Sequence, residues 1–337
     1  MIKIFDIKCS EKIVKSHWKN LEPILKVRIT EELGKLDATS DMAEIKIFRA
    51  LLEKNGRLSV KKIITGTPDK LMEIYNEILK NYNYYEDGQV IFTSEGLTNQ
   101  KKADKTAYGS KIREGLKRIF DYDNFSKKNM EWNAYSLCEK LDVRICPYCN
   151  QQFTFTIIED DAEIMRPELD HYFPKADYPM FALSIYNLIP SCHGCNSTVK
   201  GIRKMKLTEH FHPYIDEDKA FSFRCDIEEI DDTLKTDIRF EYSGNAKAKD
   251  TCEFFKLDKI YSEHTWITDK IVQTKNDYPQ SYVEELLNII KKVKPETTKE
   301  DIIKMVYASY YVDDENKEIL GKLKKDILSQ VIEQYKF

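Results

Sequence analysis

The chain has 337 residues, which is room for about two domains at roughly 150 residues each. A hydrophobic fraction of 42% with 12% aromatic residues excludes a disordered chain, and a net charge of −4 excludes a protein that is strongly basic as a whole. There is no apolar run of about 18 residues and no signal-peptide pattern at the start, so we expect a cytoplasmic protein with reduced thiols.

Residues 1–142 are expected to form a helical and mixed region. Apolar residues recur at helical spacing in 41–54, and Asp41 is a residue type that caps helices. The β-branched residues near the end of 57–65 indicate a strand, and Pro68 suits the first turn of a second helix. Further along we expect a strand at 89–94, a basic helix at 110–120 and a helix at 126–141 capped by Ser126.

Residues 207–337 are expected to be mainly helical and to pack on the middle of the chain. The stretch from Phe221 to Phe240 favours strands. Amphipathic patterns predict three helices, at 280–294, 298–311 and 315–335. Residues 143–206 lie between the two flanking regions and carry most of the residues that suit chemistry.

The net charge conceals an uneven distribution. Residues 1–150 sum to +5, residues 151–206 to −1 and residues 207–337 to −8. The densest basic stretch runs from Lys101 to Arg118, and it has two interpretations: a solvated helix face, or a surface that binds nucleic-acid phosphates. The charge of the whole chain is therefore no argument against a nucleic-acid substrate.

Four of the eight cysteines form two C-x2-C pairs, Cys146 with Cys149 and Cys192 with Cys195. In a reducing compartment such pairs indicate metal binding before disulfides. Each pair can present two thiolates to one ion, and two pairs complete the closed tetrahedron of a structural zinc site. The remaining cysteines are scattered, and we expect them to be buried small hydrophobic residues: Cys9, Cys138, Cys225 and Cys252.

An ordered set of polar residues lies between and after these pairs. It reads Leu169-Asp170-His171-Tyr172-Phe173-Pro174-Lys175, then Asn187-Leu188, then Asn196 after the last cysteine, and Lys200. The order C-x2-C, D-H-x-x-P-K, N-L-x-x-x-C-x2-C-N and K resembles the HNH endonuclease family. The resemblance covers about 60 residues, from Cys146 to Lys204, and leaves the rest of the chain uncovered.

The resemblance implies an α+β, mostly helical fold, in which a ββα-metal core with a structural zinc is flanked by helical regions. It implies that His171 is the general base that takes a proton from the attacking water, and that Asp170 and Asn196 hold a catalytic Mg²⁺ or Mn²⁺. Asn187 would fix the hairpin loop and help to orient the histidine. Many family members have histidine where this chain has Asn196, which favours Mg²⁺ over Zn²⁺ at that ion.

Basic residues near the motif are candidates for binding DNA. Lys175 and Lys200 stand where the family has lysines near the scissile strand, and Arg203 and Lys204 follow one turn on. Contact with DNA phosphates and ordinary solvated charge are the two interpretations of these side chains.

Weaker similarities, near Trp132 and in Leu257–His264, point to HNH proteins of bacterial anti-phage defence, some of which act beside an ATPase partner. The leading hypothesis is therefore a metal-dependent endonuclease that hydrolyses DNA phosphodiester bonds. Two alternatives stay open. One is a zinc-braced nucleic-acid-binding or adaptor module without catalysis, and the other is an HNH nuclease that cleaves RNA.

Overall fold

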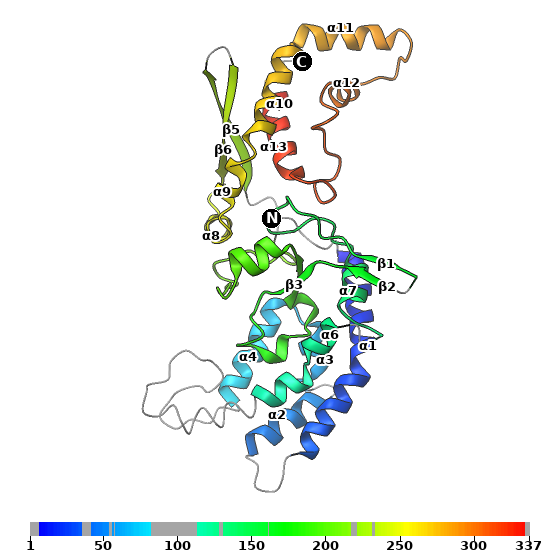
Figure 1. Ribbon diagram of the computed structural model, residues 1–337, viewed down its shortest axis with the longest axis vertical. Helices are drawn as coiled ribbons and strands as arrows, with labels where there is room; N and C mark the ends of the chain where they lie inside the picture. Colours follow the sequence, from blue (N-terminus) through cyan, green and yellow to red (C-terminus); the bar gives the residue numbers. More distant parts are fainter. Residues whose placement is uncertain are drawn as a thin grey trace.

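The computed structural model describes residues 7–35, 42–53, 56, 58–81, 113–127, 131–160, 162–216, 221–230 and 233–333. The fold is α+β, as predicted, and the described residues form many helices and three two-stranded antiparallel sheets. The molecule is elongated, with the N-terminal helices at one end, the C-terminal helices at the other and the motif-bearing segment between them (Figure 1).

The N-terminal end is a group of four helices, α1 (Ile7–Gly34), α2 (Met42–Leu52), α3 (Val60–Thr65) and α4 (Pro68–Asn81). Helices α2 and α4 confirm the predicted helices, and Pro68 opens α4 as expected. The predicted strand at 57–65 is wrong. Ser59 accepts a hydrogen bond from the Lys62 amide and starts α3, and Ile63 is fully buried, so capping and burial outweigh the β-branched composition.

Residues 113–119 form the predicted basic helix, which leads into α6 (Tyr122–Ser126) and α7 (Ala134–Leu141). The single helix expected over 126–141 is wrong, because α6 ends at Ser126 and α7 begins anew. The Asn133 side chain accepts from two amides of the first turn of α7 and caps it. The predicted strand at 89–94, the basic residues before 113 and the side chain of Cys9 lie outside the described part of the chain.

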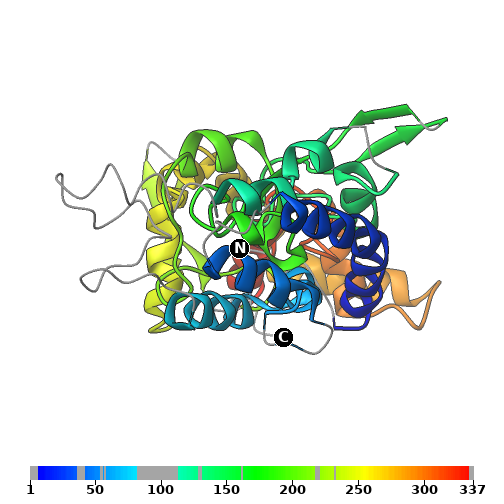
Figure 2. The same cartoon turned by 90° about the horizontal axis from the view of Figure 1, so that it is seen from below.

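The middle of the chain contains two short hairpins. The first joins β1 (Ile157–Glu159) and β2 (Ala162–Met165) and projects from one side of the molecule (Figure 2). The second joins β3 (Glu168–His171) and β4 (Leu188–Ser191), with His171 opposite Leu188 at the end of the ladder next to the connecting loop. Two short 3₁₀ turns, η1 (Pro179–Phe181) and η2 (Ile185–Asn187), lie in the connection, and the π-helix η3 (Gly194–Lys200) follows β4.

The C-terminal part begins with the predicted strands, β5 (Ser222–Ile230) and β6 (Thr233–Glu241), paired in an antiparallel ribbon. Six helices follow: α8 (Ala246–Phe254), α9 (Leu257–Ser262), α10 (Thr265–Asp277), α11 (Gln280–Lys291), α12 (Lys299–Val306) and α13 (Gly321–Ile332). The last three confirm the predicted helices with shorter bounds. Helices α10 and α13 pack against the ribbon (Figure 1).

One continuous hydrophobic cluster runs through the described residues from α1 to α13. It includes Cys138, Cys225 and Cys252, each 3% exposed, which confirms that these three cysteines are buried small residues. Among the described residues, no helix combines the length and the apolarity needed to cross a membrane.

Candidate functional site

The four paired cysteines meet in one buried cluster. The Sγ atoms of Cys146, Cys149, Cys192 and Cys195 all lie within 4.8 Å of one another. The first pair lies in the turn before β1, and the second spans the end of β4 and the start of η3. The predicted metal-binding cluster is therefore formed by the structure.

The geometry and chemistry of this cluster fit zinc. Four sulfurs about 2.3 Å from a tetrahedral Zn²⁺ lie about 3.8 Å apart, and Cys149 Sγ is 3.9 Å from Cys192 Sγ. Burial raises the pKa of the Cys146 thiol well above its usual value, so a cation is needed to hold these groups as thiolates. With four sulfur ligands and no open position, such an ion would be structural.

The first cysteine turn is held by residues from far along the chain. Asn150 adopts a left-handed conformation (φ 52°), and its side chain donates to the Glu315 carbonyl and accepts from the Lys322 amide. The Tyr261 hydroxyl donates to the carbonyl of Cys149 over 2.8 Å. The C-terminal helices are thus part of the support of the metal cluster, and the sequence pattern alone gave no signal for these contacts.

Strand β3 carries Asp170 and His171. Because successive side chains of a strand point to opposite faces, the two side chains lie in different environments. Asp170 is 2% exposed and faces Tyr148 and η3. His171 is half-buried and faces the loop between the strands, where its Nε2 donates to the Ala182 carbonyl over 3.1 Å.

The surroundings of His171 keep its imidazole neutral. Desolvation lowers its pKa to about 3, and the nearby ammonium groups of Lys175 and Lys200 act in the same direction. Since Nε2 carries the proton given to Ala182, Nδ1 is the basic nitrogen of the ring. The ring of Tyr122 packs edge-on against the imidazole, with the centroids 4.4 Å apart.

A cavity of about 210 Å³ is lined by Tyr122 and Ala182, the two residues that contact the His171 ring, but not by His171 itself. Its lining includes Tyr122, Asp123, Lys175 and Ala182, and the Lys175 ammonium bonds to Asp123 over 2.9 Å. The cavity is therefore bordered by both charged and aromatic groups. Tyr122 lies outside the motif, so the sequence pattern could not identify it.

Asn187 fixes the loop between β3 and β4. Its Oδ1 accepts from the Phe173 amide over 2.7 Å, and its Nδ2 donates to the carbonyls of Phe173 and Phe181. The side chain is fully buried. Because Phe181 precedes Ala182, these bonds also hold the carbonyl that orients His171.

Asp170 has two buried partners. Its Oδ2 accepts from the Tyr148 hydroxyl over 2.7 Å, and its Oδ1 accepts from the Lys200 ammonium over 2.5 Å. Lys200 also donates to the His171 carbonyl over 2.6 Å and is only 3% exposed. Lys200 is thus neither solvated nor presented at the surface for a phosphate, contrary to both sequence interpretations. Tyr148 lies between the two cysteines of the first C-x2-C pair, where the motif does not specify the residue type.

The donors that were expected to hold Mg²⁺ or Mn²⁺ are of suitable chemistry, since hard cations prefer carboxylate and carbonyl oxygens. In this arrangement, however, Lys200 holds Asp170. The Asn196 side chain donates instead to Glu168 over 2.8 Å. Asp170 and Asn196 as they stand do not fit a shared divalent ion.

Glu168 gathers the polar residues at the start of η3. Besides Asn196, it accepts from Ser197 and contacts His193 Nδ1 over 2.6 Å. The Glu168 carboxylate raises the pKa of the exposed His193. His193 is exposed on the turn between Cys192 and Cys195.

The other basic candidates are on the surface. Lys204 pairs with Asp177 over 3.1 Å. Arg203 lies over the Phe254 ring at 4.1 Å and donates to the Phe254 carbonyl. Together with Lys175, these cations keep part of their surface open to solvent.

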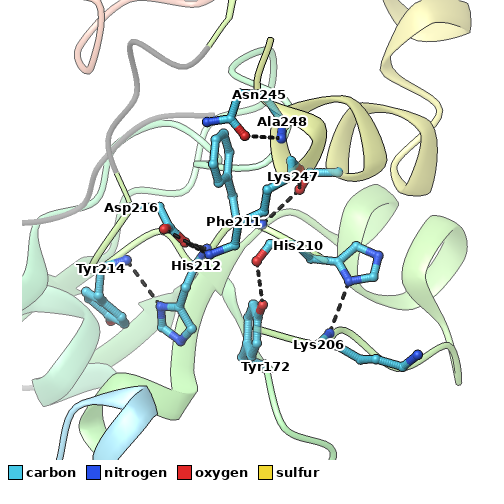
Figure 3. A network of polar contacts seen from close by, with 11 residues as sticks. Tyr172, Lys206, His210, Phe211, His212, Tyr214, Asp216, Asn245, Lys247 and Ala248 are labelled. Carbon is cyan, nitrogen blue, oxygen red and sulfur yellow. Dashed lines mark hydrogen bonds and ion pairs between the residues drawn. The ribbon is translucent and has the colours of Figure 1, made fainter. Parts of the chain in front are cut away.

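The end of β3 is anchored by a polar network (Figure 3). The Tyr172 hydroxyl donates to the His210 carbonyl, and the His212 amide donates to Asp216, which also pairs with Lys247 of α8. His212 is fully buried and its pKa is lowered to about 3 by desolvation. His210 and His212 therefore brace the loop after η3 and take no part in a metal site.

A second buried histidine braces the loop from the N-terminal side. His17 of α1 donates through Nε2 to the Leu183 carbonyl over 2.8 Å and accepts through Nδ1 from Trp132. Desolvation lowers its pKa to about 4. The loop that presents the Ala182 carbonyl is thus fixed by α1 as well as by Asn187.

Comparisons with known proteins give one short similarity. The chain is 42% identical over 55 residues to the protein ea31 of Escherichia phage lambda. The match covers 16% of this chain and 19% of that protein, so the chain spans about a fifth of the length of this curated relative. No family model matches the chain, and no solved structure matches it.

Proposed function

We propose that this protein is an HNH-type endonuclease that hydrolyses phosphodiester bonds in DNA. The observation that carries the proposal is the placement of a neutral histidine at the end of the first strand of a hairpin that ends at the four-cysteine cluster, in contact with two residues that line a cavity. A neutral His171 can accept a proton through Nδ1, while the Ala182 carbonyl fixes the other nitrogen. His171 is the proposed base for a water that attacks phosphorus.

The residues around the histidine support a role in positioning the substrate. Lys175 lines the cavity, and Arg203 and Lys204 keep partly exposed cationic groups near the end of η3. Cationic side chains at such a site bind backbone phosphates without reading the base sequence. The resemblance further implies Mg²⁺ or Mn²⁺, so the requirement for a divalent cation is part of the proposal.

The test is cleavage of supercoiled plasmid, single-stranded DNA and RNA, each with Mg²⁺, with Mn²⁺ and with a chelator. Replacing His171 with Ala should reduce cleavage by at least about 100-fold, the usual contribution of a general base. His264→Ala is the matched control, because His264 precedes α10, outside the β3–β4 hairpin, and bonds to Gln151, so it should keep cleavage. Circular dichroism checks that both variants are folded. Equal activity of wild type and His171→Ala would contradict the proposal.

One observation favours a second candidate, a zinc-braced nucleic-acid-binding or adaptor module without catalysis. Asp170 is closed off by Tyr148 and Lys200, as in a site that does not need a metal. This candidate predicts that purified protein binds DNA or a partner, cleaves neither DNA nor RNA under any metal condition, and binds unchanged after His171→Ala.

The biological setting we propose is anti-phage defence beside an ATPase partner. Its support is the weak similarity near Trp132 and in Leu257–His264. Expression in a bacterial host with and without a neighbouring ATPase gene should reduce phage plaques only when both genes and His171 are intact.

A further inference from the structure

We propose that this protein forms a two-fold symmetric dimer, in which helix α11 of one copy packs antiparallel against α11 of a second copy. The helix lies at the end of the molecule opposite the N-terminal helices (Figure 1), and it carries a line of exposed apolar side chains. The dimer goes beyond the proposed function and does not depend on it, since its test reads molecular mass and not cleavage.

Helix α11 presents an apolar stripe to solvent. Tyr282, Ile289 and Val293 are 46%, 52% and 89% exposed, and the half-buried Leu286 lies between the first two. Their positions place them on one side of the helix, in the pattern of the a and d positions of a coiled coil. Lys292 keeps helical dihedral angles, and the Val293 amide bonds to the carbonyl of the residue one turn earlier, so the helical spacing holds to the end of the stripe.

A different side of α11 joins it to its own chain. Val283 and Leu287 are buried, and the helix packs on α12. On a helix with about 3.6 residues per turn, these two positions lie about a third of a turn away from the stripe. Single exposed apolar residues are ordinary, whereas an ordered line of them along a helix marks a contact surface. The stripe is thus a second apolar side that the chain itself leaves exposed.

The charges along α11 indicate that the occupant is a second copy of the same helix. The exposed Glu284 and Glu285 lie in its first half, and the exposed Lys291 and Lys292 lie at its end. Turning a second α11 end for end brings basic end and acidic half together twice, because a two-fold contact repeats itself. A parallel pair would place like charges together. The same order of charges also suits the helix dipole, so variants that exchange the charges are needed to distinguish pairing from a property of the single helix.

One antiparallel register satisfies the stripe. It sets Tyr282 opposite Val293 of the second copy and Leu286 opposite Ile289 of the second copy, so each apolar side chain meets an apolar one. These pairings repeat on the other side of the two-fold axis, and all four stripe residues of each copy are used.

The same register brings Glu285 of each copy near Lys292 of the other. Each of these residues immediately precedes a stripe residue, on the flank of the stripe opposite the buried Val283 and Leu287. They are seven residues apart, as are the flanking positions of a coiled coil that form ion pairs between helices. Two such pairs would border the apolar contact.

The contact is small, so the dimer should be weak and reversible. Four stripe residues on each copy give an interface below about 1,200 Å², which is the class of weak and transient contacts. Sedimentation equilibrium of the full-length, zinc-loaded protein should therefore show a mass that rises with concentration from monomer to dimer.

Ile289→Ser should weaken this dimer by about 100-fold, because each dimer loses two buried isoleucine side chains and each contributes about tenfold. Ile202→Ser is the control, since Ile202 is 98% exposed and lies outside α11, and it should dimerise as the wild type does. Circular dichroism checks the fold of both variants. A monomer at every concentration up to the solubility limit would overturn the proposal and leave the stripe to a different protein. A dimer that survives Ile289→Ser would also overturn it.

Charge exchange tests the antiparallel direction. Glu285→Lys and Lys292→Glu should each weaken the dimer by about 5- to 30-fold at low salt, because two ion pairs become two repulsions. The variant with both substitutions should recover the wild-type affinity. Lys291→Glu is the control on the opposite side of the helix and should leave the affinity unchanged. Failure of the double variant to recover would overturn antiparallel pairing.

A chemical cross-link tests the register without any variant. A carbodiimide joins a carboxylate to an amine only where the two are in contact. In a mixture of unlabelled and heavy-nitrogen protein, Glu285 should be joined to Lys292 in peptides that combine the two labels, whereas Glu284 should not be joined to Lys291. Mass spectrometry reads both products. Absence of the mixed Glu285–Lys292 product from a sample that sediments as a dimer would overturn this register.

Discussion

At Asn187, one side-chain amide supplies three hydrogen bonds to main-chain groups of the loop between β3 and β4. Buried main-chain groups need such partners, since each one left without a partner costs about 1–3 kcal/mol. The residue thus combines a structural task with the placement of the Ala182 carbonyl against His171.

We expect Asn187→Ala to lower the free energy of unfolding by about 2 kcal/mol or more, because it removes the partner of the Phe173 amide and of the Phe173 carbonyl, whereas the Phe181 carbonyl still accepts from the Ser184 amide. Urea denaturation followed by fluorescence measures the change. Asn20→Ala is the control, since the Asn20 side chain makes a single local bond to the Ser16 carbonyl, and its effect should stay below about 1 kcal/mol. Equal effects of the two substitutions would show that the loop does not depend on Asn187.

The four-cysteine cluster gives a second prediction at this scale. About one equivalent of zinc per chain should co-purify, because four thiolates close one tetrahedral site. Cys146→Ser should lose the metal and unfold at a lower temperature, since the binding energy of a structural zinc is also folding energy. Cys252→Ser, at a buried cysteine outside the cluster, should keep the full zinc content. Metal analysis and thermal melts distinguish the two.

At the scale of elements, helices α10 and α13 supply side-chain hydrogen bonds to main-chain groups at the edges of the two-stranded ribbon of β5 and β6. The Gln330 side chain of α13 accepts from the Cys225 amide and donates to the Cys225 carbonyl, and Asp326 accepts from the Phe223 amide. On the other strand, Asp269 of α10 accepts from the Thr236 amide. Side chains thus take the place of a further strand along both edges, which also blocks edge-to-edge pairing.

Gln330→Ala should therefore speed hydrogen exchange at the Cys225 amide, because the bond that protects it is lost. The amides of the same ribbon that pair strand to strand should change much less. Exchange measured by mass spectrometry or NMR tests this. A uniform increase along the ribbon would indicate general destabilisation of the fold and would contradict a local edge contact.

The elements that sequence patterns predicted best are those with a clear apolar face, such as α4 and α11. The patterns failed where a local cap decided the outcome, as Ser59 does for α3 and Asn133 for α7. In the site, the C-x2-C spacing of Cys146 with Cys149 and of Cys192 with Cys195 indicated the metal-binding cluster, because the spacing within each pair is a local property. The partners of Asp170 could not be predicted. Tyr148 and Lys200 reach it only because the first C-x2-C turn and η3 both pack on β3.

At the scale of the whole molecule, buried histidines connect distant parts of the chain. His17 links α1 to the loop after β3, and His212 lies in the network beside Tyr172. Both are neutral in the folded protein, because desolvation lowers their pKa values to about 4 and about 3. In the unfolded chain each would titrate near its usual pKa of about 6.5.

Stability should consequently fall as the pH is lowered from about 6.5 towards 4. In that window the unfolded chain binds protons that the folded protein excludes, so protonation favours unfolding, and each such histidine contributes up to about 1.4 kcal/mol per pH unit. Urea denaturation at pH 7.5, 6 and 5 measures the slope. His17→Gln should reduce the slope even if it lowers stability at pH 7.5. A flat profile between pH 6.5 and 5 would contradict this account.

The contacts of Asn150 have a consequence for synthesis on the ribosome. The knuckles are complete once Cys195 has been translated, but the groups that hold Asn150, the Leu320 and Lys322 amides, belong to the start of the last helix. At about 5–20 residues per second, those groups emerge on the order of ten seconds later. The four cysteines are therefore available to a metal ion early in synthesis, yet the turn that carries Asn150 lacks these contacts until the start of α13 has been translated. A product truncated before α13 should hold a bound metal less tightly.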